Sequence, residues 1–256
     1  MLNDHSKASI AQIVFYAPAL ALAVILRHRH GRPRMPWVIL SLFCIIRIAC
    51  GIVVILHENK PRDVGLIVAS FILLNAGVFP LIAATIGFLR IVTAMDIKSN
   101  SKLRSALIFT RILFLAGAVL LIAGGSLVAN YKNQSDMSTG MKLVKAGYVV
   151  IVVFIACLLG FQAVFSSRRN VLSPSSLTVL KGILAAMPFI AVRITYLFLS
   201  VYHPSDDRWN DLSGAIGPFV VMVLLMEYVV VGIYITTGFL IPVIGKQAER
   251  FQQDSS

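Results

Sequence analysis

The sequence predicts an all-α membrane protein, a polytopic bundle of seven helices with its N-terminus outside and its C-terminus in the cytosol. Hydrophobic residues make up 58% of the chain and charged residues 13%, against roughly 45–50% and 25% in soluble proteins. Mean hydropathy is +0.85. Apolar stretches of at least 19 residues recur, which is long enough for a helix to cross a bilayer. The expected spans are residues 8–26, 37–56, 64–89, 105–129, 143–165, 182–201 and 216–241.

The first three spans each have a recognisable end. The basic run from Arg27 to His30 follows the first span and is typical of a cytosolic end. A short polar segment precedes that span, rather than a basic leader with a cleavage site, so we expect the helix to be retained. Trp37 begins the second span and favours the membrane interface. Arg90 follows the third span directly.

The last four spans differ in the residues that shape them. In the fourth, the step from Gly117 to Gly124 and Gly125 favours close helix packing, within one chain or between two copies in a homo-oligomer. The fifth span is long and apolar. Pro188 and Pro218 lie in the sixth and seventh spans, where proline can bend a membrane helix without ending it.

Loop charges give the orientation. Sorting Lys and Arg by alternate loops gives thirteen on one side, seven on the other and three inside helices. Because cytosolic loops carry the excess of positive charge, the larger group is assigned to the cytosol. The formal net charge of +12 is therefore expected to attract anionic membrane lipids, and we expect no nucleic-acid partner.

Short connections between the spans indicate a single membrane domain over residues 1–256. Asn133 begins an N-glycosylation sequon, which lies in an outer loop in the predicted orientation. The expected location is the endoplasmic reticulum membrane or the plasma membrane.

Four polar residues lie at the same depth in four different spans. Arg47, Asn75, Arg193 and Glu227 are each within two residues of the middle of their span. An ionisable side chain at a helix centre costs about 2.5–3.5 kcal/mol on insertion scales, so such residues usually face the bundle interior and have partners. The spacing therefore predicts one shared polar layer at the middle of the membrane.

Two tyrosines border the predicted layer. Tyr196 follows Arg193 by three residues and Tyr234 follows Glu227 by seven, so each shares a helix face with its ionisable neighbour. The four polar residues and these two tyrosines form the predicted ligand-binding site.

Two cations against one anion favour a ligand-handling function. Residual positive charge at mid-depth can bind a phosphate, carboxylate or enolate group of an otherwise apolar molecule. The leading hypothesis is a membrane protein that handles a small amphipathic or lipid-like ligand. Two alternatives stay open: a terpene or meroterpenoid cyclase with Glu227 as its acid, and a non-catalytic scaffold in which the same residues form a buried network. Whether the protein is an enzyme is left open.

No metal and no cofactor are expected. The spacing of Asp206, Asp207 and Asp211 resembles a magnesium-binding motif, but Arg208 interrupts it and the sequence has no second acidic motif. Lys181 lies at the start of a span, so the middle of the last helix offers no lysine for a retinal Schiff base.

Several short segments, spread over nearly the whole chain, occur together. They are Phe15 to Leu20, Arg47, Leu74-Asn75 with Pro80-Leu81, Pro188 with Arg193 to Tyr196, and Glu227 through Tyr234 to Phe239. In these segments the chain resembles a family of uncharacterised fungal seven-helix membrane proteins. The resemblance implies an integral membrane protein associated with fungal specialised metabolism. In size and topology, the chain is also similar to fungal lipid-translocating, toxin-resistance membrane proteins and to membrane-bound meroterpenoid cyclases.

Overall fold

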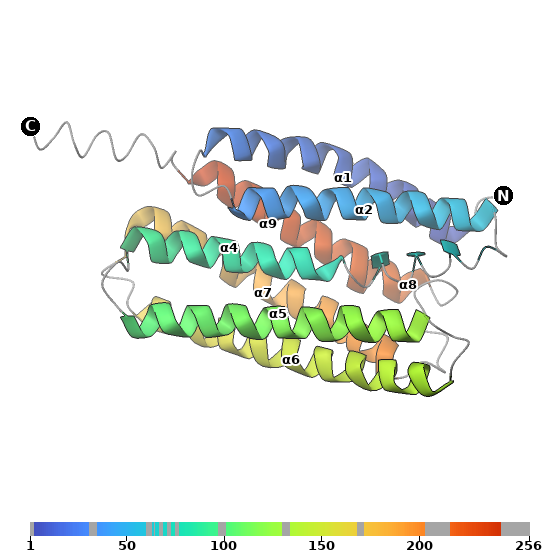
Figure 1. The fold of residues 1–256 in the computed structure, drawn as a ribbon. Coiled ribbons are helices and arrows are strands. Elements are labelled where there is room, and N and C mark those ends of the chain that lie inside the picture. The colour runs from blue at the N-terminus through green and yellow to red at the C-terminus, as the bar shows by residue number, and fades with distance from the viewer. Residues whose placement is uncertain are drawn as a thin grey trace, which may run out of the picture.

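The computed structural model of the chain describes most of its residues, and in them every regular element is a helix (Figure 1). The described residues are 3–30, 35–59, 63, 65–66, 69–70, 73–74, 77–96, 101–129, 134–167, 172–202 and 216–241. The elements are α1 (Asp4–Arg29), α2 (Met35–Asn59), α4 (Val78–Asp96), α5 (Ser101–Ala129), α6 (Gln134–Ser167), α7 (Pro174–Tyr202), α8 (Ile216–Phe219), the π-helical segment η3 (Val220–Leu225) and α9 (Met226–Leu240).

The predicted seven-helix membrane bundle is confirmed. Six helices in the described residues are long and apolar enough to cross a membrane, and α8, η3 and α9 together form the last of them. The seventh helix, α4, has a shorter apolar part, Val78–Thr93. The protein is therefore an integral, multi-pass membrane protein.

The helices in the structure continue beyond several of the predicted span ends. In the third predicted span, residues 64–89, the described positions 65–66, 69–70 and 73–74 are helical, and α4 runs from Val78 past residue 89 to Asp96. Pro80 lies in the first turn of α4, where its missing N–H needs no helical partner. Most other helices extend past the predicted spans, because backbone hydrogen bonding continues into polar residues at the membrane surface.

The start of α7 shows why a helix extends beyond its apolar run. The N–H of Ser176 donates to Oγ of Ser173 over 3.3 Å, which caps the helix, and Pro174 occupies the first helical position. Both are local signals for a helix start, and they place it eight residues before the apolar span predicted from residue 182.

The helices lie side by side along one long axis (Figure 1). The antiparallel pair of α1 and α2 forms one side of the bundle, and the antiparallel pair of α5 and α6 forms the opposite side. Between them, α4 packs against α2 and α7, and α7 packs against α9. The buried core lies where these central helices meet, around Phe43, Phe88, Ile190 and Val230.

The α5–α6 pair is held at close range by glycine. A Cβ on Gly140 would lie 2.8 Å from the carbonyl oxygen of Gly124 and from the amide nitrogen of Val128, so only glycine fits there. Of the predicted small-residue step, Gly117 and Gly124 face α6 in the same chain, whereas Gly125 faces open space. Close approach between backbones is the usual role of small residues in membrane helix pairs.

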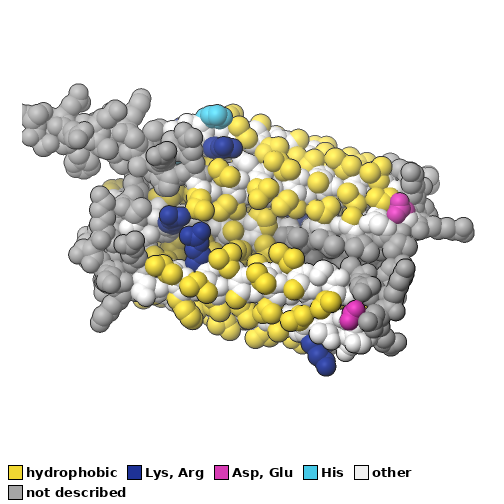
Figure 2. All heavy atoms as spheres, in the orientation of Figure 1, with side chains coloured by type: hydrophobic (Ala, Val, Ile, Leu, Met, Phe, Trp, Pro, Cys, Tyr) yellow, Lys and Arg dark blue, Asp and Glu magenta, His cyan; other side chains and the backbone are white. Residues whose placement is uncertain are grey.

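Large apolar side chains face outward along the bundle, as expected of a surface in contact with lipid. Val14, Leu115, Val119 and Ile122 are all more than half exposed. Figure 2 shows hydrophobic side chains across the middle of the visible face and acidic side chains toward one end. Trp37, expected at the interface, is instead buried against His30 and Phe88, because the N-terminal turn of α2 packs into the bundle.

Candidate functional site

The structure brings the three predicted ionisable residues together. Arg47 on α2 and Arg193 on α7 both donate hydrogen bonds to Oε1 of Glu227 on α9. The bond from Arg193 uses Nε and spans 2.8 Å. All three side chains are at most 2% exposed. These residues form what we call the charge layer, and they confirm that the mid-span positions of α2, α7 and α9 meet.

Tyr16 on α1 completes the carboxylate's surroundings, although the sequence reasoning did not include it. Its hydroxyl donates to Oε2 of Glu227 over 3.2 Å, and its side chain is fully buried. Both oxygens of the carboxylate therefore accept hydrogen bonds. Tyr16 lies one residue from the middle of its predicted span, so the depth criterion that selected Arg47 could have selected it too.

Neighbouring residues make further contacts with the two arginines. Nη2 of Arg193 donates to the carbonyl of Leu74 over 3.3 Å, and Nε2 of Gln12 donates to the carbonyl of Arg47 over 2.5 Å. A Cβ on Gly77 would lie 2.7 Å from Cζ of Arg47, so the backbone before α4 lies directly against the guanidinium. The predicted site residue Asn75 lies between Leu74 and Gly77, outside the described residues.

The two predicted tyrosines lie in different places. Tyr196 is fully buried, and its ring lies 5.8 Å from Cζ of Arg193, so it borders the charge layer. Tyr234 pairs instead with Thr85 on α4, with 2.5 Å between the hydroxyl oxygens. Two helical turns separate Tyr234 from Glu227, which amounts to about 10 Å along the helix axis.

Aromatic rings enclose the charge layer on the α1 side. The ring of Tyr228 stacks on the ring of Phe15, with 3.9 Å between their centroids, and packs edge-to-face with Tyr16, with 5.5 Å between centroids. Tyr16 also contacts Phe43 edge-on at 5.4 Å. The hydroxyl of Tyr228 is buried and has no hydrogen-bond partner among the described residues.

The charge layer holds more hydrogen-bond donors than acceptors. Nε and Nη1 of Arg47, and Nη1 of Arg193, are buried without an acceptor among the described residues. Among the residues that the structure describes, two guanidinium groups face one carboxylate, which leaves one positive charge without a counter-charge. Because an arginine in a membrane interior is stable only with partners, this excess marks the layer as a candidate anion-binding site.

The π-helical segment η3 leads directly into the helix that carries Glu227. A π-turn adds a residue to a helical turn and so changes which face the following residues present; such segments are frequent at functional sites. Pro188 lies inside α7, five residues before Arg193. One helix of the charge layer therefore has a π-helical turn, and another has a proline, close to its charged residue.

Other predicted positions lie outside the described residues or apart from the layer. Asn133, the predicted glycosylation site, and the aspartates from Asp206 to Asp211 belong to the former group. In the part of the chain that the structure describes, no group of three His, Cys, Asp or Glu side chains could hold a metal ion.

One protein-family model matches the chain, over residues 2–244, and its description is a domain of unknown function, DUF7702. No curated protein and no solved structure is significantly similar to the chain.

Proposed function

The chain belongs to the DUF7702 family, and from its geometry we propose that it is a membrane protein that binds an anionic, amphipathic ligand at the charge layer. The observation that carries this proposal is a positive charge without a counter-charge, and buried N–H groups without an acceptor, in the described part of the chain. A buried cation without a partner is costly, and an anion with several acceptor oxygens would satisfy the charge and the donors together.

The chemistry of the layer defines the class of ligand. A carboxylate, phosphate or enolate group could accept from the free N–H groups of Arg47 and Arg193. The surrounding helices are apolar, so the rest of the ligand would be an apolar chain or ring system.

Ligand entry would require the helices around the layer to separate, because its side chains are at most 2% exposed. The proline in α7 and the π-helical segment before α9 provide places where these helices can bend. An incoming anion would compete with Glu227 for the two guanidiniums. In the ligand-free protein, Glu227 would hold the two arginines in position for the incoming anion.

A non-catalytic scaffold is the second candidate, and one observation favours it. The backbone at Gly77 lies against Arg47, and both oxygens of Glu227 are used, as in a tightly packed structural network. A cyclase gains less support from this geometry. An acid catalyst must present a proton to its substrate, whereas both oxygens of Glu227 accept hydrogen bonds from the protein.

The ligand hypothesis is tested by mass spectrometry of small molecules that co-purify with the protein. We expect an anionic amphiphile to accompany the wild type and to be lost from Arg193→Gln, which leaves the balanced pair of Arg47 and Glu227. The control is Lys181→Gln, the same charge change at an exposed position of the same helix. Identical small-molecule inventories in all three proteins, at matched membrane levels, would contradict ligand binding and support the scaffold.

A further inference from the structure

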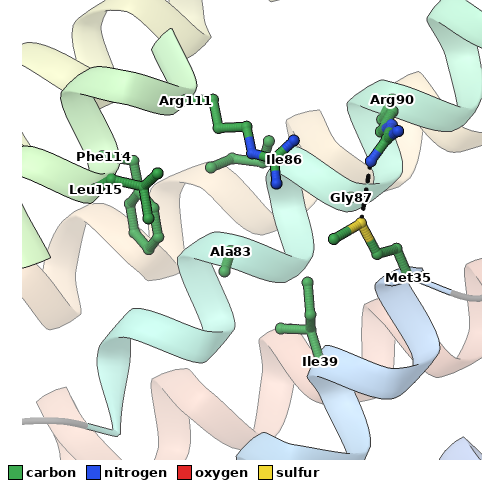
Figure 3. Close-up of a pocket in the computed structure, with 9 residues that line it drawn as sticks. All are labelled: Met35, Ile39, Ala83, Ile86, Gly87, Arg90, Arg111, Phe114 and Leu115. Atoms are coloured by element: carbon green, nitrogen blue, oxygen red, sulfur yellow. Dashed lines mark hydrogen bonds between the residues drawn. The ribbon is translucent and has the colours of Figure 1, made fainter. Parts of the chain in front are cut away.

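A second positively charged site lies at the side of the bundle, separate from the charge layer. A cavity of about 180 Å³ opens between α2, α4 and α5. The reason is the packing of α5, which runs closely along α6 but touches α4 at few points. Figure 3 shows the cavity with Ile39 from α2, Ala83 and Ile86 from α4, and Phe114 from α5 around it.

Two arginines stand in this otherwise apolar lining. Arg90 comes from α4 and Arg111 from α5, and the side chain of Arg111 reaches toward α4 (Figure 3). Among the described residues, the cavity lining contains no acidic side chain. Within the described residues, neither arginine forms an ion pair, and Nη1 of Arg90 donates to Sδ of Met35 over 3.1 Å. A thioether is a weak acceptor, so both cations retain strong donors that face the cavity's surroundings.

The cavity lies near one end of the helix bundle. Met35 is the first residue of α2, and Arg90 lies in the last two turns of α4, so the cavity is near the end of the bundle where α1 ends in Arg27 and Arg29. The charge bias of the loops assigns this end to the cytosolic leaflet. Arg111 lies about ten residues inside α5, on a face that is otherwise exposed and apolar and that we expect to face lipid.

We propose that this cavity binds the phosphate headgroup of an anionic phospholipid. Each guanidinium could donate two N–H groups to phosphate oxygens, which is the bidentate geometry that arginine favours for phosphate. The first part of an acyl chain would lie over Ala83, between Ile86 and Leu115, where the small alanine side chain leaves space. The lipid site shares no residue with the charge layer, so it does not depend on the function proposed there.

The test measures lipid binding to the detergent-purified protein by native mass spectrometry. The probes are dioleoylphosphatidylglycerol and dioleoylphosphatidylcholine, with inorganic phosphate as a competitor. We expect tighter binding of the anionic lipid, and binding about tenfold weaker in Arg90→Gln and in Arg111→Gln. Lys181→Gln, with the same loss of one charge at an exposed position, should bind as the wild type does.

A variant with unchanged net charge distinguishes lipid binding in the cavity from binding to a basic surface. Ala83→Leu would fill the space above the alanine and should weaken binding without changing net charge. Both arginines are exposed, so their variants should fold, which far-ultraviolet circular dichroism and size-exclusion chromatography would verify. Equal binding of the two lipids, equal binding by all variants, undisturbed binding in Ala83→Leu, or full displacement by inorganic phosphate would each overturn the phospholipid site.

Discussion

Glu227 is the residue on which the charge layer depends, because it is the shared acceptor for two buried arginines. We predict that Glu227→Gln lowers the free energy of unfolding by about 3–5 kcal/mol, since it leaves two buried cations without a carboxylate. Arg193→Gln should cost less, because Arg47 and Glu227 remain as a balanced pair. Thermal unfolding of the purified variants in one detergent checks the order, and a smaller loss in Glu227→Gln than in Arg193→Gln would contradict it.

Gly77 tests how closely the backbone is packed against Arg47. In Gly77→Ala, the new Cβ would lie 2.7 Å from Cζ of a guanidinium that Glu227 holds in place. We predict a loss of about 1–3 kcal/mol, the usual cost of overpacking. Gly232→Ala is the matched control, because a Cβ there meets nothing within 4 Å. Equal stability of the two variants would show that Arg47 can move aside.

His30 makes stability depend on pH at the end of α1. Its Nε2 donates to the carbonyl of Gly238 over 2.7 Å, and its ring stacks on Trp37. Burial lowers the pKa of His30, and the nearby Arg29 lowers it further, although the bond to Gly238 opposes them. The folded state therefore favours the neutral ring, so the stability it contributes is complete above about pH 6.5 and is lost as the pH falls below that value.

The wild type should therefore unfold at lower temperature at pH 5 than at pH 7.5. His30→Asn keeps a side-chain donor without this titration, so its unfolding temperature should fall less over the same interval. An identical fall in both proteins would assign the pH dependence to other groups.

At the scale of elements, the α5–α6 pair depends on close contact between the two backbones. We predict that Gly140→Ala lowers the unfolding temperature, because its Cβ would meet backbone atoms of α5 that cannot rotate away. Gly125→Ala, which faces open space on the same pair, should be neutral or slightly stabilising. Thermal unfolding of both variants is the measurement, and a neutral Gly140→Ala would show that the two helices can separate without loss.

The orientation of the whole molecule can be tested with the two ends of α6. Ser135 and Ser167 lie near its first and last residues, and both are exposed. In sealed microsomes with the cytosolic face outward, we expect Ser167→Cys to react with a membrane-impermeant maleimide and Ser135→Cys to react only after detergent. The wild type is the control, because its three cysteines lie within helices and two of them are buried. The opposite labelling pattern would reverse the predicted topology.

Helix number and helix depth were predictable because each depends on local composition. The length of the apolar runs gave the seven spans, and the middle of each run gave the shared depth of Arg47, Arg193 and Glu227. Side-chain pairing was less predictable. Tyr234 shares a helix face with Glu227, but a rise of about 1.5 Å per residue separates them along the axis, and Thr85 is the nearer partner.

The lateral cavity was not predictable from the sequence at all. Arg90 and Arg111 are 21 positions apart, and nothing local indicates that α5 would pack along α6 and leave space beside α4. Helix spacing of this kind is set by side-chain fit between elements distant in sequence, such as the contact of Gly140 with Gly124.

The positive charge of the layer is tested most directly by the response of Glu227→Gln to an anionic amphiphile. Decanoate at submicellar concentration is the probe, and decanol is the neutral control of equal chain length. Decanoate should raise the unfolding temperature of Glu227→Gln more than that of the wild type, because it supplies the missing acceptor to two arginines, and decanol should raise neither. Equal shifts with decanoate in both proteins, or none in either, would contradict an anion-binding charge layer.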